Sequence, residues 1–121
     1  MLREIKFRGR HNGDLVYGDL VHKHCNGGFC YTIETLMGAI YLVDPETIGQ
    51  FTGLRDKNGV EVYEGDMVEA FKYGDEGQRF ELTVTHRHCF MFGNWTIVEF
   101  LDKFRMAMVI GNVFQKQGVI E

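Results

Sequence analysis

The amino-acid sequence predicts an all-β protein. Fifteen Gly against a single Pro supply residues for many tight turns, and ten Phe with five Tyr suit the pleated, half-buried surface of strands. Apolar and polar residues also alternate along much of the chain, which is the period of a strand covered on one face. We therefore expect one domain, residues 1–121, in which an N-terminal meander of residues 1 to about 43 packs on a barrel-like half from about 46 to 114, with at most one short helix.

The N-terminal half is predicted to form four strands joined by tight turns. In the first strand Ile5 and Phe7 lie on one side and charged residues lie on the other. Asn12-Gly13 is the strongest hairpin signal, because both residues accept a positive φ. The strands expected after it are residues 14–24, residues 29–33 after the turn at 26–28, and residues 39–43 after a break around Gly38.

The C-terminal half is predicted to alternate short strands with polar turns. Residues 44–47, Asp-Pro-Glu-Thr, are expected to form a turn or a single helical turn, because Pro fixes φ and its neighbours can bond to nearby amides. Glu64-Gly65-Asp66 predicts a tight turn at which two strands meet nearly at a right angle. Residues 98–104 fit either a short helix or a strand. The remaining extended segments are expected at residues 49–52, 79–86 and 108–114.

One stretch of the sequence is more specific than these patterns. Residues 49–66, GQFTGLRDKNGVEVYEGD, resemble the central signature of the YopX family of bacteriophage and prophage proteins. The opening REIKFR at 3–8 with VYG at 16–18, and the closing VIGNVF at 109–114, agree with the same family in the same order. The resemblance implies an all-β fold, a phage or prophage origin and a homo-oligomer, and it brings no established activity or catalytic residue.

The signature also has a physical interpretation of its own. Asp56, Asn58 and Gly59 form one turn, and Gly65 with Asp66 forms another, because Asx and Gly residues adopt dihedrals that most residues avoid. We interpret these five as structural residues. The alternative is a carboxylate cluster of Asp56, Asp66 and the neighbouring Glu64 that binds a divalent cation through oxygen ligands.

A repeated tetrad places four of the five histidines in two pairs, His22 with His24 and His86 with His88, each pair followed by a cysteine. Residues two apart share one face of a strand, so two such pairs facing each other could hold zinc or nickel. A His-x-His on a polar strand face is more often exposed and idle, and nothing in the sequence makes the two strands neighbours. We expect no metal site there and no cofactor.

The first strand carries a basic stripe of Lys6, Arg8 and Arg10 on one face. Small β-barrels bind single-stranded nucleic acid by pairing such cations with stacking aromatic rings. A formal charge of −4 opposes a nucleic-acid partner, and Lys and Arg commonly blunt exposed edge strands. Nucleic-acid binding is therefore a disfavoured alternative.

Cys25, Cys30 and Cys89 are an odd number without a Cys-x-x-Cys pair, so we expect free thiols in a reducing cytoplasm. No continuous apolar run predicts a signal peptide or a membrane span, so no membrane partner is expected.

The functional expectation follows from these patterns together. The sequence has no serine, no nucleophile elbow and no phosphate-binding loop, so we expect a protein that is not an enzyme. Its expected role is a phage or prophage accessory protein of the bacterial cytoplasm that acts through protein contacts. It is expected to be a homo-oligomer with a host or phage protein as partner.

Overall fold

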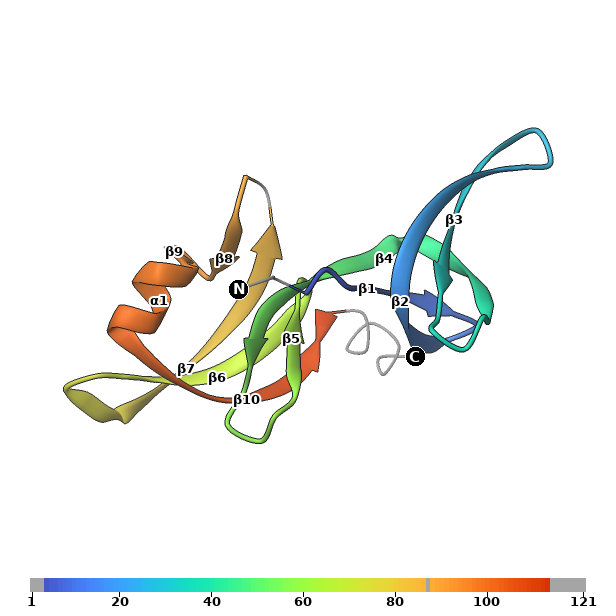
Figure 1. The fold of residues 1–121 in the computed structure, drawn as a ribbon. Coiled ribbons are helices and arrows are strands. Elements are labelled where there is room, and N and C mark those ends of the chain that lie inside the picture. Colours follow the sequence, from blue (N-terminus) through green and yellow to red (C-terminus); the bar gives the residue numbers. More distant parts are fainter. Residues whose placement is uncertain (1–3, 87, 114–121) are drawn as a thin grey trace. The chain divides into compact units, whose positions relative to one another are not determined.

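The computed structural model describes residues 4–86 and 88–113, and within these ranges the chain forms ten strands and a single short helix (Figure 1). The all-β prediction is confirmed. The contacts divide the chain into two compact units, one up to Gly53 and one from Leu54 onward, and each is described by itself.

The N-terminal unit is a closed ring of four antiparallel strands, β1 (Phe7–His11), β2 (Asp14–Cys25), β3 (Gly28–Glu34) and β4 (Ile40–Arg55). β1 pairs with β2, β2 with β3 and β3 with β4, and β4 returns to pair with β1. Within this unit, β2 pairs with β1 and β3, and β4 pairs with β3 and β1, each along different parts of its length. The predicted meander is therefore present and closes on itself, whereas the sequence placed the barrel-like part in residues 46–114.

The hairpin predicted at Asn12-Gly13 is confirmed. Asn12 has a φ of 50° and Gly13 a φ of 89°, and the register pairs His11 with Asp14 on either side of the turn. Asn is one of the few residues other than Gly that tolerates the left-handed region. Local turn chemistry thus fixes how β1 and β2 begin their pairing.

Two glycines make the small ring possible. A Cβ on Gly9 would lie 2.9 Å from the Cβ of Val43, and a Cβ on Gly18 would overlap the carbonyl oxygen of Glu34. Gly18 ends the pairing of β2 with β1, and pairing with β3 begins one residue later. Missing side chains therefore allow the close backbone approach that closes the ring.

The turn predicted at residues 44–47 is wrong, because β4 continues through them. The pairing of β1 with β4 shifts register between Arg8 and Arg10 at this point. The Thr47 hydroxyl donates a hydrogen bond of 2.7 Å to the Asp44 carbonyl and accepts one of 2.8 Å from the Arg10 N–H. A side chain thus replaces a ladder bond, so Pro45 is tolerated at an irregularity inside a strand.

The β2–β3 hairpin extends beyond the part of β3 that pairs with β4, and it projects from the ring in Figure 1. Cys25 and Cys30 form a disulfide near its tip, with their Cα atoms 5.9 Å apart. The prediction of free thiols is wrong for this pair, because the hairpin brings the two Cα atoms within disulfide range. Cys89 is exposed and is not disulfide-bonded.

The C-terminal unit contains a five-stranded antiparallel sheet in the order β10-β6-β7-β8-β9. Its members are β6 (Asp66–Lys72), β7 (Asp75–His86), β8 (Phe90–Phe92), β9 (Trp95–Thr96) and β10 (Phe104–Asn112), and the short strand β5 (Glu61–Tyr63) precedes them. The last strand was predicted to end at Phe114, which lies outside the described residues.

Residues 98–104 fitted either a helix or a strand in the sequence, and the structure shows a helix there, α1 (Ile97–Lys103). Its N-cap Thr96 accepts a hydrogen bond from the Glu99 N–H, and the Glu99 carboxylate accepts one of 3.0 Å from the Thr96 N–H. This capping box starts the helix despite its β-forming residues. The helix places the fully buried Phe100 ring 4.4 Å from that of Phe92 in the core of the unit.

Candidate functional site

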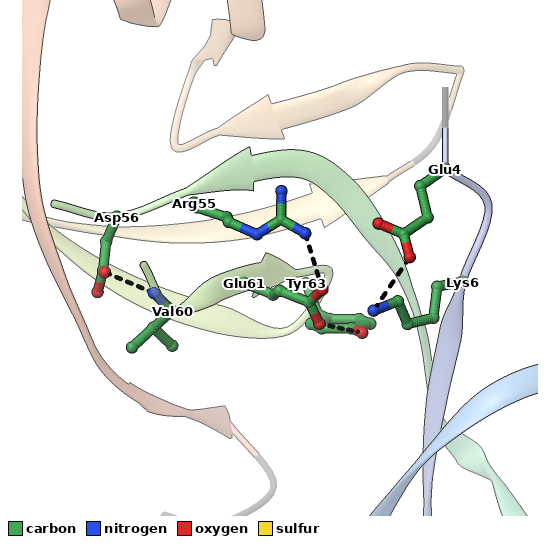
Figure 2. Close-up of polar contacts among 7 residues, drawn as sticks. All are labelled: Glu4, Lys6, Arg55, Asp56, Val60, Glu61 and Tyr63. Atoms are coloured by element: carbon green, nitrogen blue, oxygen red, sulfur yellow. Dashed lines mark hydrogen bonds and ion pairs between the residues drawn. The ribbon is translucent and has the colours of Figure 1, made fainter. Parts of the chain in front are cut away.

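The basic stripe is not a free cationic face. Lys6 forms an ion pair of 3.3 Å with Glu4 (Figure 2). Its ammonium lies 5.6 Å from the centre of the Phe51 ring, and Arg8 is 3% exposed. Arg10 is half-buried. The prediction that only the apolar face of this strand is covered is wrong, because Arg8 on the charged face is buried while Ile5 on the apolar face is 65% exposed.

The first signature turn is organised by a single carboxylate. Asp56 is 6% exposed, and its Oδ1 accepts hydrogen bonds of 2.9 Å from the N–H groups of Asn58 and Val60 (Figure 2). Its Oδ2 accepts one of 2.9 Å from the Val109 N–H, and Gly59 takes a φ of 84°. Burial raises the pKa of the Asp56 carboxyl, but the three N–H donors outweigh it and lower the pKa below the usual value of 3.8.

The second signature turn is anchored in a similar way. Asp66 is 1% exposed, and its Oδ2 accepts a hydrogen bond of 2.8 Å from the Tyr63 N–H. Gly65 has a φ of 95°, its N–H donates to the Val84 carbonyl over 2.8 Å, and its own carbonyl accepts from the Val113 N–H over 2.9 Å. Gly65 and Asp66 therefore have a structural role, because their hydrogen bonds hold neighbouring backbone segments in place.

Three carboxylate oxygens of the alternative cation site already accept backbone hydrogen bonds. Both oxygens of Asp56 accept backbone hydrogen bonds, and one oxygen of Asp66 does the same. Glu64, which lies between Asp56 and Asp66 in sequence, is half-buried. Within residues 4–86 and 88–113, no group of three or more His, Cys, Asp or Glu side chains is arranged to hold a metal ion.

The histidines of the two tetrads lie in different units. His22 and His24 are exposed on β2, where the His22 ring stacks 4.5 Å from Tyr31 and the His24 ring lies 4.3 Å from Phe29. His86 ends β7 with its ring 4.5 Å from that of Phe90, and His88 is exposed. Each described contact of these rings is with an aromatic side chain.

An open groove of about 390 Å³ lies on the N-terminal unit. It is lined by residues 4–6 at the start of the described chain, residues 17–19 in the middle of β2 and residues 34–37 at the turn from β3 to β4. The groove opens where β2 leaves β1 and begins to pair with β3. Gly18 lies in its lining at this crossing point.

Two apolar side chains project at the rim of the groove. Leu36 is 103% exposed and Met37 is 93% exposed, and both occupy the β3–β4 turn. The turn is held by three hydrogen bonds, from the Thr35 N–H to the Ala39 carbonyl, from the Gly38 N–H to the Thr35 carbonyl and from the Ala39 N–H to the Thr35 hydroxyl, at 2.9, 3.0 and 3.1 Å. The two exposed side chains are therefore presented on an ordered backbone.

The sequence interpretation missed Leu36 and Met37. A signal was present, because turns are usually built from polar residues with Gly or Pro, and here two large apolar residues precede the turn glycine Gly38. Periodicity alone assigned them to the break between two strands. Their exposure and their position beside residues 4–6 are properties of the tertiary structure.

A comparison with protein-family models matches residues 18–121 to the family described as YopX protein. The match covers both signature turns and most of the chain. The chain belongs to the YopX family. No curated protein matches the chain at a significant level of similarity. In the described part of this YopX-family chain, no helix is long and apolar enough to cross a membrane.

Proposed function

We propose that this YopX-family chain is a non-enzymatic interaction protein of a phage or prophage, acting in the bacterial cytoplasm, and that the groove on the N-terminal unit contacts a partner protein. The observation that carries the proposal is the full exposure of Leu36 and Met37 on a hydrogen-bonded turn. Covering a Leu or Met side chain is worth about 1.5–3 kcal/mol, so two of them at one rim are effective anchors for a partner.

The chemistry of the lining supports binding rather than catalysis. Ile5 and Tyr17 contribute apolar surface beside the rim, and both are exposed. The buried carboxylates Asp56 and Asp66 belong to turns of the other unit, where backbone amides occupy them. The groove therefore offers apolar surface and charge at its edges, which is the usual composition of an interaction surface.

Nucleic acid is a weaker candidate for the same surface. The cations that would bind phosphates are engaged otherwise, because Arg8 is buried and Lys6 is ion-paired with Glu4. The formal charge of −4 repels a polyanion.

The proposal is tested with a double variant, Leu36→Ser with Met37→Ser, and a matched control, Ile40→Ser with Leu42→Ser. The control removes two aliphatic side chains, each 57% exposed, from β4 of the same unit outside the groove lining. Each protein is used as bait in lysates of cells carrying the phage or prophage, and retained proteins are quantified by mass spectrometry.

We expect at least one protein that the wild type and the control retain and that the rim variant loses. Melting curves of all three baits establish that each is folded. Equal retention by the rim variant and the wild type would overturn the proposal.

A further inference from the structure

The groove carries an unusual charge arrangement in addition to its apolar rim. Asp19 of β2 and Glu34 of β3 are directly opposite each other in the antiparallel register. Side chains in such a pair have Cβ atoms about 4.5–5.5 Å apart, and like charges placed there repel each other. Both residues line the groove. A strand pair thus retains two carboxylates side by side at the edge of an apolar surface.

The neighbouring cations compensate this charge only in part. Lys23 forms an ion pair of 3.0 Å with Glu34, and Lys6 forms one with Glu4. Asp19 is exposed and forms no ion pair with any residue in the part of the chain that the structure describes. The groove lining itself contains three carboxylates and one ammonium group. The lining therefore has a formal charge of −2, which favours a cation.

We propose that the groove binds a partner-protein segment in which a Lys or Arg is flanked by apolar side chains. The cation lies between Asp19 and Glu34, and the apolar side chains cover Leu36 and Met37. This inference names the partner chemistry of the groove and rests on the proposed function.

The same charges decide between possible occupants. A second copy of this chain carries a formal charge of −4 and is repelled by an acidic groove, as is a nucleic acid. A basic apolar segment meets both parts of the surface at once. Because Asp19 is exposed and Glu34 is only half-buried, the attraction is screened by salt.

The test uses three fluorescein-labelled peptides of equal length, in which Leu alternates with Lys, Leu alternates with Glu, and Ser alternates with Lys. Fluorescence anisotropy with the full chain is measured at low and high salt. We expect the Leu/Lys peptide to bind at least about tenfold more tightly than either of the others, and to weaken as salt rises. Asp19→Asn should weaken its binding, and Asp19→Lys should weaken it further.

Asp14→Asn is the matched control, because Asp14 is an exposed carboxylate on the same strand at the other hairpin turn. The Asp14→Asn variant should bind the Leu/Lys peptide as tightly as the wild type does. Leu36→Ser with Met37→Ser should abolish binding of the Leu/Lys peptide if the groove is the site.

Two outcomes overturn the inference. The first is equal binding of the Leu/Lys and Leu/Glu peptides with loss of both in the rim variant, which leaves the apolar groove and the proposed function standing. The second is the absence of rim-dependent binding by all three peptides. The proposed function itself is decided separately, by the capture of a cellular protein that depends on the rim.

Discussion

The carboxylate of Asp56 accepts a hydrogen bond of 2.9 Å from the N–H of Val109, which lies 53 residues further along the chain. Lys57 adds a second link by donating its N–H to the Ala107 carbonyl over 3.3 Å. Strand β10 is at the edge of the C-terminal sheet, so these contacts occupy backbone groups that an edge strand would otherwise expose. The first signature turn therefore shapes its own loop and covers part of a sheet edge.

Replacing Asp56 by Asn should lower the free energy of unfolding by about 1–3 kcal/mol near neutral pH. The amide Oδ1 of Asn can still accept from the turn, but its NH₂ would face the Val109 N–H, donor against donor. Chemical denaturation of Asp56→Asn measures the loss. Lys57→Ala, an exposed side chain on the same turn, is the control and should change little.

The effect of Asp56 on stability should depend on pH. Its pKa in the folded protein is lowered from 3.8, so its stabilising contribution is fully present above that value and is lost as pH falls through the folded pKa. The stability difference between wild type and Asp56→Asn should therefore be constant between about pH 5 and 7 and shrink in more acidic solution. A difference that grows on acidification would contradict the assignment.

Gly59→Val should lower the melting temperature by several degrees. Gly59 has a φ of 84°, and a β-branched residue in that region costs on the order of 1–3 kcal/mol. A Cβ at Gly59 meets no atom within 4 Å, so the expected loss comes from backbone strain alone. Gly77→Val is a matched control, because Gly77 is equally open and has no positive φ. Equal melting temperatures for the two variants would show that strain at Gly59 is unimportant.

Gly18→Ala should destabilise the N-terminal ring more than Gly28→Ala does. Its Cβ would overlap the backbone carbonyl of Glu34, which cannot move without disturbing the pairing of β2 with β3. Overpacking of this kind costs about 1–3 kcal/mol. Gly28→Ala, with open space around its Cβ, provides the comparison in thermal melting. Similar melting temperatures would mean that the ring accommodates a methyl group at Gly18.

Self-association is a further prediction. Val98 and Leu101 are one helical turn apart on α1 and are 78% and 46% exposed, so a second copy could cover them. Static light scattering should give a mass that is a multiple of 14.0 kDa, and Val98→Glu with Leu101→Glu should reduce it. A mass near 14.0 kDa for the wild type at every concentration would refute the prediction.

Stoichiometric zinc should leave the melting temperature unchanged at neutral and at mildly acidic pH. The rings of His22, His24 and His86 lie against aromatic side chains, and a metal site would need converging nitrogens from several residues. A stabilisation that disappears both in His22→Ala and in His86→Ala would contradict this and establish a site shared by the two tetrads.

The sequence by itself determined the features that depend on local chemistry. Asn12-Gly13 specifies a hairpin because both residues accept a positive φ, which places a strand at residues 14–24, and the turn residues at 26–28 place the next one at residues 29–33. The signature around Asp56 and Gly59 identified the family for the same reason, since fixed turn dihedrals leave a recognisable pattern of residues. The capping box of α1 was also present in the sequence, although residues 98–104 were left open between helix and strand.

Tertiary structure alone decided which distant segments meet. The pairing of β4 with β1 closes the ring, and Arg8 is buried in it. β4 also continues as one strand through Pro45. The groove is lined by the Leu36 turn, by residues 4–6 and by the middle of β2, segments that are far apart in sequence. These outcomes depend on backbone pairing and on space between residues far apart in sequence, for which neither periodicity nor turn propensity carries information.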